Sequence, residues 1–309
     1  MKKKILITTT GACLAKELIS SKLNSEFEYI FTNEIVTDKD KLKLLLSDAS
    51  AVIIGSEFLD REILHLSNQL RIIVRLGGGI SNIDVEYAAS KNIKIYEIKC
   101  ENVSRDTALL SLGLFCSYIF NFQKHFSDSK FSKWDRIANK ETDQILGIVG
   151  SGRVALYLAK SLGSMGFKIV YWSRSSKKEF DKIGCYYINN LAKLIKESKA
   201  IFIALALVDD TKNFIDMRFL RDMKGKILIN TSRGGIVNEK DVLYSLDNKF
   251  LEAYLTDVTE KEPPADISLK LRSHKKVLTT PHIGGYSINN LCFVLQTAMD
   301  IIYKHFKIN

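Results

Sequence analysis

The chain of 309 residues is too long for one ordinary hydrophobic core and suits two domains of about 150 residues each. It is 46% hydrophobic and 26% charged, with no low-complexity segment or fixed repeat, which excludes a disordered or repeat protein. The formal net charge of +10 comes from lysines scattered along the chain. It indicates a solvated surface that would attract anionic ligands, and no nucleic-acid partner is predicted.

Cysteine usage and hydropathy limit the kinds of site and the location that are expected. The five cysteines show no CxxC spacing, which argues against a disulfide framework and a zinc site and favours a reducing cytoplasm. The longest helix-like apolar run, 109–120, is well short of the roughly 18 residues that a transmembrane helix needs. We therefore expect a soluble cytoplasmic protein with no metal ion and no membrane partner.

Short β-branched runs alternate with helical patterns from the first residues onward. In chain order, the first series has strands at 4–8, 51–54, 71–74 and 93–96 and a helix at 11–22. A long apolar helix at 103–126 and a polar segment at 128–142 follow. The second series has strands at 145–149, 168–172, 200–205, 226–230, 253–256 and 276–279, before a final amphipathic helix at 287–306. This alternation predicts βαβ units with parallel sheets in two successive α/β domains.

A glycine-rich loop follows the first strand of the second series. In the segment ILGIVGSGRVALYLA, Gly150, Gly152 and Ala155 are the three small residues, and the helix begins at Arg153 and Val154. Such a turn lets the backbone amides at the helix start receive a pyrophosphate, and Arg153 would add positive charge. The loop predicts a dinucleotide site, although glycine turns of this kind also occur for purely structural reasons.

The residues after the next strand indicate which dinucleotide is bound. An acidic side chain normally takes the ribose hydroxyls of NAD about 20 residues after the glycine loop. The sequence here is YWSRSSKK, in which Ser173, Arg174, Ser175 and Lys177 offer donors and positive charge. We therefore expect NADP to be preferred, with NAD as a possible cofactor. The alternative is an ordinary solvated basic turn.

Three chemically active side chains follow three strands of the second series. They are Arg233, Glu262 and His282. The carboxyl ends of parallel strands share one sheet edge, where open α/β sheets bind ligands. An imidazolium that donates a proton, a carboxylate that orients it and a guanidinium that holds a substrate carboxylate together suit hydride transfer to a carbonyl. Taken singly, each has a structural alternative: a sheet-edge ion pair for Arg233, a turn acid before prolines for Glu262, and a capping or core histidine for His282.

Five segments form a set of motifs along the chain. They are RLGGGISNID (75–84), GIVGSGRVA (147–155), MKGKILINTSRGGIVNE (223–239), DVTEKEP (257–263) and TPHIGG (280–285). In this order they resemble the D-isomer-specific 2-hydroxyacid dehydrogenases, which include phosphoglycerate dehydrogenase and the glyoxylate/hydroxypyruvate reductases. The resemblance implies that Arg233, Glu262 and His282 are catalytic. It also implies that Asp257 lies near the nicotinamide carboxamide, and that the substrate carboxylate is received by the backbone of Gly77, Gly78 and Gly79.

The resemblance also implies a fold and an assembly. Two Rossmann-like domains are expected: a discontinuous, flavodoxin-like substrate domain at 1–100 plus 287–309, and an inserted dinucleotide-binding domain at 101–286. In the family, the long helix after Glu101 is part of a dimer contact, so a homodimer is expected.

Departures from the family pattern leave the substrate open. Ser81 replaces an aspartate, and Gly55 stands where phosphoglycerate dehydrogenases often carry the arginine of a VRSxT motif. The predicted reaction is hydride transfer between a nicotinamide cofactor and a 2-keto acid or D-2-hydroxy acid. A true 3-phosphoglycerate dehydrogenase is one alternative, and a nucleotide-sensing corepressor on the same fold is another.

Overall fold

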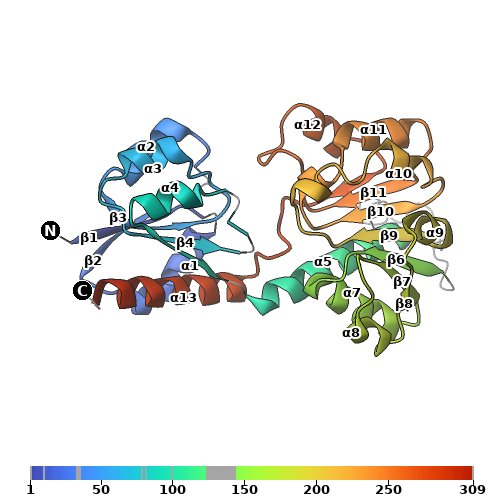
Figure 1. Cartoon of the computed structure of the whole chain (residues 1–309), viewed down its shortest axis with the longest axis horizontal. Coiled ribbons are helices and arrows are strands. Elements are labelled where there is room, and N and C mark those ends of the chain that lie inside the picture. The colour runs from blue at the N-terminus through green and yellow to red at the C-terminus, as the bar shows by residue number, and fades with distance from the viewer. Residues whose placement is uncertain are drawn as a thin grey trace, which may run out of the picture. The chain divides into compact units, whose positions relative to one another are not determined.

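The computed structural model describes residues 2–9, 11–32, 36–77, 79–80, 82–98, 100–122 and 144–307. The chain divides into two compact units, Met1–Val103 with Gly285–Asn309, and Ser104–Gly284 (Figure 1). It therefore passes from one unit to the other twice. Gly78, Ser81 and the predicted polar segment 128–142 lie outside the described residues.

The first unit contains a five-stranded parallel sheet in the order β2-β1-β3-β4-β5. Its strands are β1 (Lys3–Ile7), β2 (Phe27–Phe31), β3 (Ala49–Ile54), β4 (Ile72–Leu76) and β5 (Lys94–Ile98). This is the flavodoxin-like order, with its topological switch point between β1 and β3. The sequence patterns missed β2, because it is an edge strand in which only Phe27 is buried.

Helices cover both faces of this sheet (Figure 1). They are α1 (Ala12–Ile19), α2 (Lys39–Leu46), α3 (Arg61–Leu66), α4 (Val85–Ser90) and α13 (Ile288–Lys307), with a 3-10 turn at Ser20–Lys22. Ile5 and Ile7 of β1 pack in one core with Leu295 of α13, whereas Leu6 packs in the other core with residues of α2, α3 and α4. Alternate strand residues point to opposite faces, so one apolar run supplies both cores. The last helix of the chain thus completes the first unit.

The second unit contains a seven-stranded parallel sheet in the order β12-β11-β10-β9-β6-β7-β8. Its strands are β6 (Ile145–Val149), β7 (Lys168–Trp172), β8 (Tyr186–Tyr187), β9 (Ala200–Ile203), β10 (Ile227–Asn230), β11 (Ala253–Thr256) and β12 (Val277–Thr279). Counted from β8, six strands follow the order of Rossmann dinucleotide-binding sheets, with the switch point between β6 and β9. The two-residue edge strand β8 was also missed by the sequence patterns.

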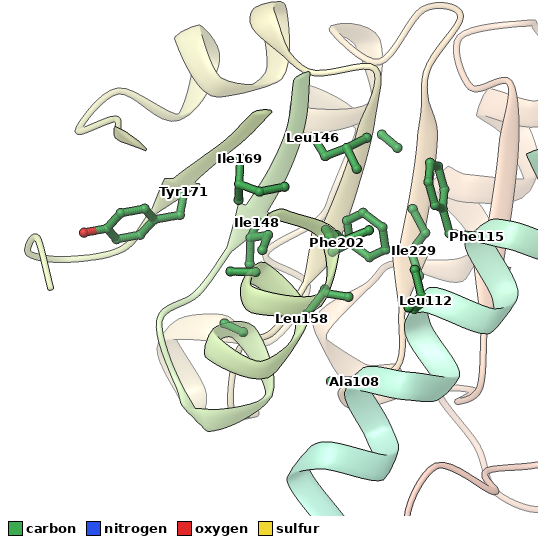
Figure 2. Close-up of a cluster of buried hydrophobic side chains, with 14 of the residues drawn as sticks. Ala108, Leu112, Phe115, Leu146, Ile148, Leu158, Ile169, Tyr171, Phe202 and Ile229 are labelled. Atoms are coloured by element: carbon green, nitrogen blue, oxygen red, sulfur yellow. The ribbon is translucent and has the colours of Figure 1, made fainter. Parts of the chain in front are cut away.

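Helices also cover both faces of the second sheet. One face carries α5 (Glu101–Ile119), α7 (Arg153–Ser164) and α8 (Lys178–Asp181). The other carries α9 (Leu191–Glu197), α10 (Met217–Arg221), α11 (Glu239–Asp247) and α12 (Ile267–Arg272). Figure 2 shows the first of these cores, in which Leu112 and Phe115 of α5 lie beside Ile229 and Phe202. The rings of Phe115 and Phe202 meet edge to face at a centroid distance of 5.5 Å.

Two parallel sheets with helices on both faces confirm the predicted α/β fold class. The strand after the glycine loop lies at 168–172, as predicted, so Ser173 and Arg174 come directly after β7. Strand β9 ends at Ile203, two residues earlier than the predicted 205. Within the described ranges, no helix is long and apolar enough to cross a membrane.

Candidate active site

Glu262 and His282 are in direct contact beyond the carboxyl ends of β11 and β12. Glu262 Oε2 lies 2.5 Å from His282 Nδ1. The side chains are 27% and 36% exposed, respectively, so the pair is accessible to a ligand. Because Glu262 engages Nδ1, Nε2 is the ring nitrogen placed to exchange a proton with a substrate.

Asp257 holds the backbone that carries His282. This residue is 2% exposed, and its Oδ1 accepts hydrogen bonds from Thr280 Oγ1 at 2.6 Å and from Ile283 N at 2.8 Å. Its Oδ2 accepts a bond from Gly284 N at 2.9 Å, and its main-chain oxygen accepts one from His282 N at 2.8 Å. His282 has a φ of 56°, in the left-handed region that few residues other than glycine adopt. These four bonds keep the strained backbone in place.

The loop that carries Arg233 packs against the loop that carries Glu262. Asn230, at the end of β10, is fully buried, accepts a bond from Ser232 N at 3.0 Å and donates one to Arg233 O at 3.1 Å. The next residue, Gly234, lies so close to the neighbouring loop that a Cβ there would be 1.9 Å from Thr259 O. Only glycine permits this approach of the two loops.

A buried glutamate supports the Glu262 loop. Glu239 is 1% exposed, and it accepts bonds from Glu260 N at 2.9 Å and from Ser268 Oγ at 2.5 Å. Thr259 N donates to Glu262 Oε1 at 3.2 Å. Both oxygens of Glu262 are therefore engaged, one by the backbone and one by the His282 ring, which orients the carboxylate toward the imidazole.

The glycine loop fits the pyrophosphate of a dinucleotide. Gly150 has a φ of 123°, and a Cβ there would lie 2.2 Å from Ala204 O, so the loop passes tightly over the end of β9 at the switch point. Gly152 is the N-cap of α7, makes no side-chain cap, and has open space where a Cβ would be. The first turn of α7, with Arg153 exposed and Val154 half-buried, therefore offers amides to an anion.

The loop after β7 is fastened by its own hydrogen bonds. Ser173 Oγ donates to Ser175 O at 2.6 Å, Tyr187 Oη donates to Ser173 O at 3.2 Å, and Lys177 N donates to Tyr171 Oη at 2.8 Å. We expected Ser173 to donate a hydrogen bond to the cofactor, but its hydroxyl donates to Ser175 O within the loop instead. Arg174, the next residue, is exposed.

In the first unit, the glycine turn after β4 already holds a carboxylate of the protein. Gly77 and Gly79 have φ values of 100° and 90°, and Gly79 N donates to Glu97 Oε1 at 2.5 Å. Gly78, predicted to share this role, lies outside the described residues. A backbone amide in a turn of this kind is a suitable carboxylate receptor, as the contact with Glu97 illustrates.

Asn82 joins the glycine turn to the loop after β3. Its Nδ2 donates to Glu57 O at 2.6 Å and to Gly55 O at 3.3 Å, while Arg75 Nε donates to its Oδ1 at 3.3 Å. Glu57 is 2% exposed, and burial raises the pKa of its carboxyl, whose Oε2 accepts a bond from Gly55 N at 2.8 Å. The segments that follow β3 and β4 are therefore bonded to each other.

Comparison with known proteins identifies the family. A family model described as D-isomer specific 2-hydroxyacid dehydrogenase, NAD binding domain, matches residues 112–284. A hydroxypyruvate reductase of Thermotoga maritima is 31% identical over 300 residues, which cover 95% of each chain. The chain belongs to the D-isomer-specific 2-hydroxyacid dehydrogenase family.

Other relatives of this dehydrogenase agree in family or fold. A D-3-phosphoglycerate dehydrogenase of Methanocaldococcus jannaschii is 28% identical over 284 residues, 88% of this chain and 54% of that protein. The apo-structure of D-lactate dehydrogenase from Escherichia coli matches with a TM-score of 0.85 at 18% identity, over 99% of this chain and 97% of that one, which shows the shared fold. The predicted reaction class, hydride transfer between a nicotinamide cofactor and a hydroxy or keto acid, is confirmed.

Sequence reasoning missed several residues that hold the site of this dehydrogenase. Asn230, Gly234 and Glu239 all lie inside the quoted motif at 223–239, yet none was assigned a role. Glu239 follows the N-cap Asn238, where an acid is ordinary because it suits the helix dipole. The one available signal was the glycine pair directly after Arg233, which indicated a backbone approach at that point.

Gly234→Ala should strongly reduce turnover while the glycine loop still binds cofactor. The added Cβ would overlap Thr259 O and push apart the loops that carry Arg233 and Glu262. Gly235→Ala is the matched control, because a Cβ there meets only the flexible end of Leu207, at 3.2 Å. Steady-state kinetics and fluorescence titration with NAD(P)H measure the two effects. Equal kinetics in both variants would contradict the role assigned to Gly234.

Proposed function

We propose that this dehydrogenase reduces a 2-keto acid to a D-2-hydroxy acid, or catalyses the reverse reaction, at the Glu262–His282 pair. The nicotinamide cofactor supplies or accepts the hydride. In the reduction, His282 Nε2 donates a proton to the carbonyl oxygen, and Glu262 orients the ring and stabilises its charge. Arg233 holds the substrate carboxylate and polarises the carbonyl. The 2.5 Å contact between Glu262 and His282 is the observation that carries this proposal.

The residues after β3 favour a substrate without a phosphate group. Gly55 offers no cation at the position where phosphoglycerate dehydrogenases often have arginine, and the buried Glu57 adds a carboxyl group nearby. The full-length similarity to a hydroxypyruvate reductase supports the same choice. We therefore propose a small monoanionic 2-keto acid, ahead of 3-phosphohydroxypyruvate, as the substrate class.

Oxidation of NADPH with glyoxylate, pyruvate and hydroxypyruvate tests this proposal. Wild-type protein should turn over at least one of these acids, and His282→Asn should lower kcat by about 10²–10⁴-fold, the usual contribution of a positioned proton donor. Cofactor affinity should be nearly unchanged in the variant. Tight cofactor binding without turnover of any acid would instead support a nucleotide-sensing corepressor.

We also propose that NADPH is preferred to NADH. Arg174 follows β7 directly and is exposed, so its guanidinium can form charge-assisted hydrogen bonds with a 2′-phosphate. Such bonds contribute about 1.5–3 kcal/mol each. The internal bonds of Ser173, Tyr171 and Tyr187 support this role because they fix the backbone that presents Arg174.

Arg174→Ala should lower kcat/KM for NADPH by about tenfold and change that for NADH little, since one charge-assisted bond exceeds the 1.4 kcal/mol that corresponds to a factor of ten. Arg221→Ala, which removes the same charge from an exposed position on α10, is the control. A wild-type preference for NADH, or an unchanged cofactor ratio in Arg174→Ala, would refute the assignment.

A homodimer built on α5 is proposed from the family resemblance. Leu109 of α5 is 65% exposed, although its neighbours Ala108 and Leu112 are buried in the core of the second unit. The side chain of Leu109 is therefore accessible to a second copy of the chain. Light scattering at micromolar concentration should give twice the chain mass of 35.0 kDa. A monomeric mass, or a dimer unaffected by Leu109→Asp, would contradict this contact.

A cytoplasmic location is proposed from the thiol chemistry. Cys100, Cys116, Cys185 and Cys292 are free thiols. Burial raises the pKa of Cys116 and raises that of Cys185 to about 11, which keeps both largely protonated and unreactive. Unpaired thiols of this kind support a reducing compartment.

A further inference from the structure

Glu97 occupies the backbone amide that the substrate carboxylate is proposed to use. Its Oε1 accepts a hydrogen bond from Gly79 N at 2.5 Å, at an exposed position. The register of the sheet places it there: Arg75 of β4 is paired with Glu97 of β5, and Gly77 N donates to Ile98 O at 3.3 Å. The end of β5 therefore runs beside the glycine turn and presents Glu97 to it.

This contact has two consequences for an incoming anion. The Gly79 amide has one hydrogen, so two carboxylates cannot both take it as their main donor, and they would repel each other if both stayed near. Because Glu97 is tethered to β5, it competes at a high effective concentration. A substrate anion must therefore displace the Glu97 carboxylate.

We propose that Glu97 is a specificity-determining residue that competes with the substrate carboxylate for Gly79 N. This inference rests on the proposed function of the glycine turn. Glu97 raises the KM for 2-keto acids and leaves the hydride-transfer step unchanged, because it acts on substrate binding alone. Neutral aldehydes and ketones carry no carboxylate to exchange for Glu97, so the residue weakens the binding of carboxylates alone.

Glu97→Gln tests the competition in the active enzyme. The neutral amide is a weaker acceptor than the carboxylate, so the KM for the best 2-keto acid should fall about fivefold to tenfold. The values of kcat and of the KM for NADPH should change less than about twofold. Glu86→Gln is the matched control, since Glu86 is an exposed acid on α4 of the same unit. An unchanged or higher KM in Glu97→Gln, or an equal fall in Glu86→Gln, would overturn the proposal.

A binding measurement separates this inference from the proposed function. Oxamate is a carboxylate that can stand in for a 2-keto acid but is not reduced. It is titrated into wild type and Glu97→Ala while the amide resonance of Gly79 is followed by NMR. In Glu97→Ala, the Gly79 resonance should shift as oxamate is added, and oxamate should bind that variant about tenfold more tightly than it binds wild type. If the resonance does not move, the inference fails even in an active enzyme. If oxamate binds more tightly but no 2-keto acid is reduced, the proposed function fails and the competition stands.

Discussion

The buried carboxylate of Asp257 is the group on which the catalytic edge of the second unit depends. It accepts three hydrogen bonds from the segment 280–284, and the main chain of the same residue bonds to Asn230 O and His282 N. A polar group removed from water is stable only with such donors. A carboxylate has about four acceptor positions, and the segment 280–284 fills three of those of Asp257.

The loops on this edge are positioned by close backbone contacts and by buried acids. Gly234 against Thr259 and Gly150 against Ala204 are approaches that any Cβ would block. Glu239 and Asp257, both nearly inaccessible to solvent, then bind the loop backbone from inside the unit. As a result, Glu262 and His282 stand on segments whose backbone is bonded to buried acids.

The two units offer ligands different electrostatic surroundings. In the second unit, Arg174 in the loop after β7 is exposed, and the N-terminus of α7 has no side-chain cap. Both features suit the phosphates of a dinucleotide. In the first unit, β5 presents Glu97 to the glycine turn, while Glu57, after β3, is buried. Arg75 lies on β4, between β3 and β5 in the sheet. An acidic group beside the glycine turn opposes the binding of an anion there, which is the basis of the competition proposed for Glu97.

The sequence alone determined the fold class, most of the strands, the glycine loop and the three candidate catalytic residues. These are local properties, since a buried parallel strand is a short apolar run and a motif keeps its residues at fixed spacing. The edge strands β2 and β8 were missed because only one of their residues, Phe27, is buried. The contacts that define the sites were decided only by the tertiary structure. Glu262 meets His282 across 20 positions, Asp257 meets Gly284 across 27, and Gly79 meets Glu97 across 18. Such partners depend on which strand ends become neighbours in a sheet, and no pattern within one segment contains that information.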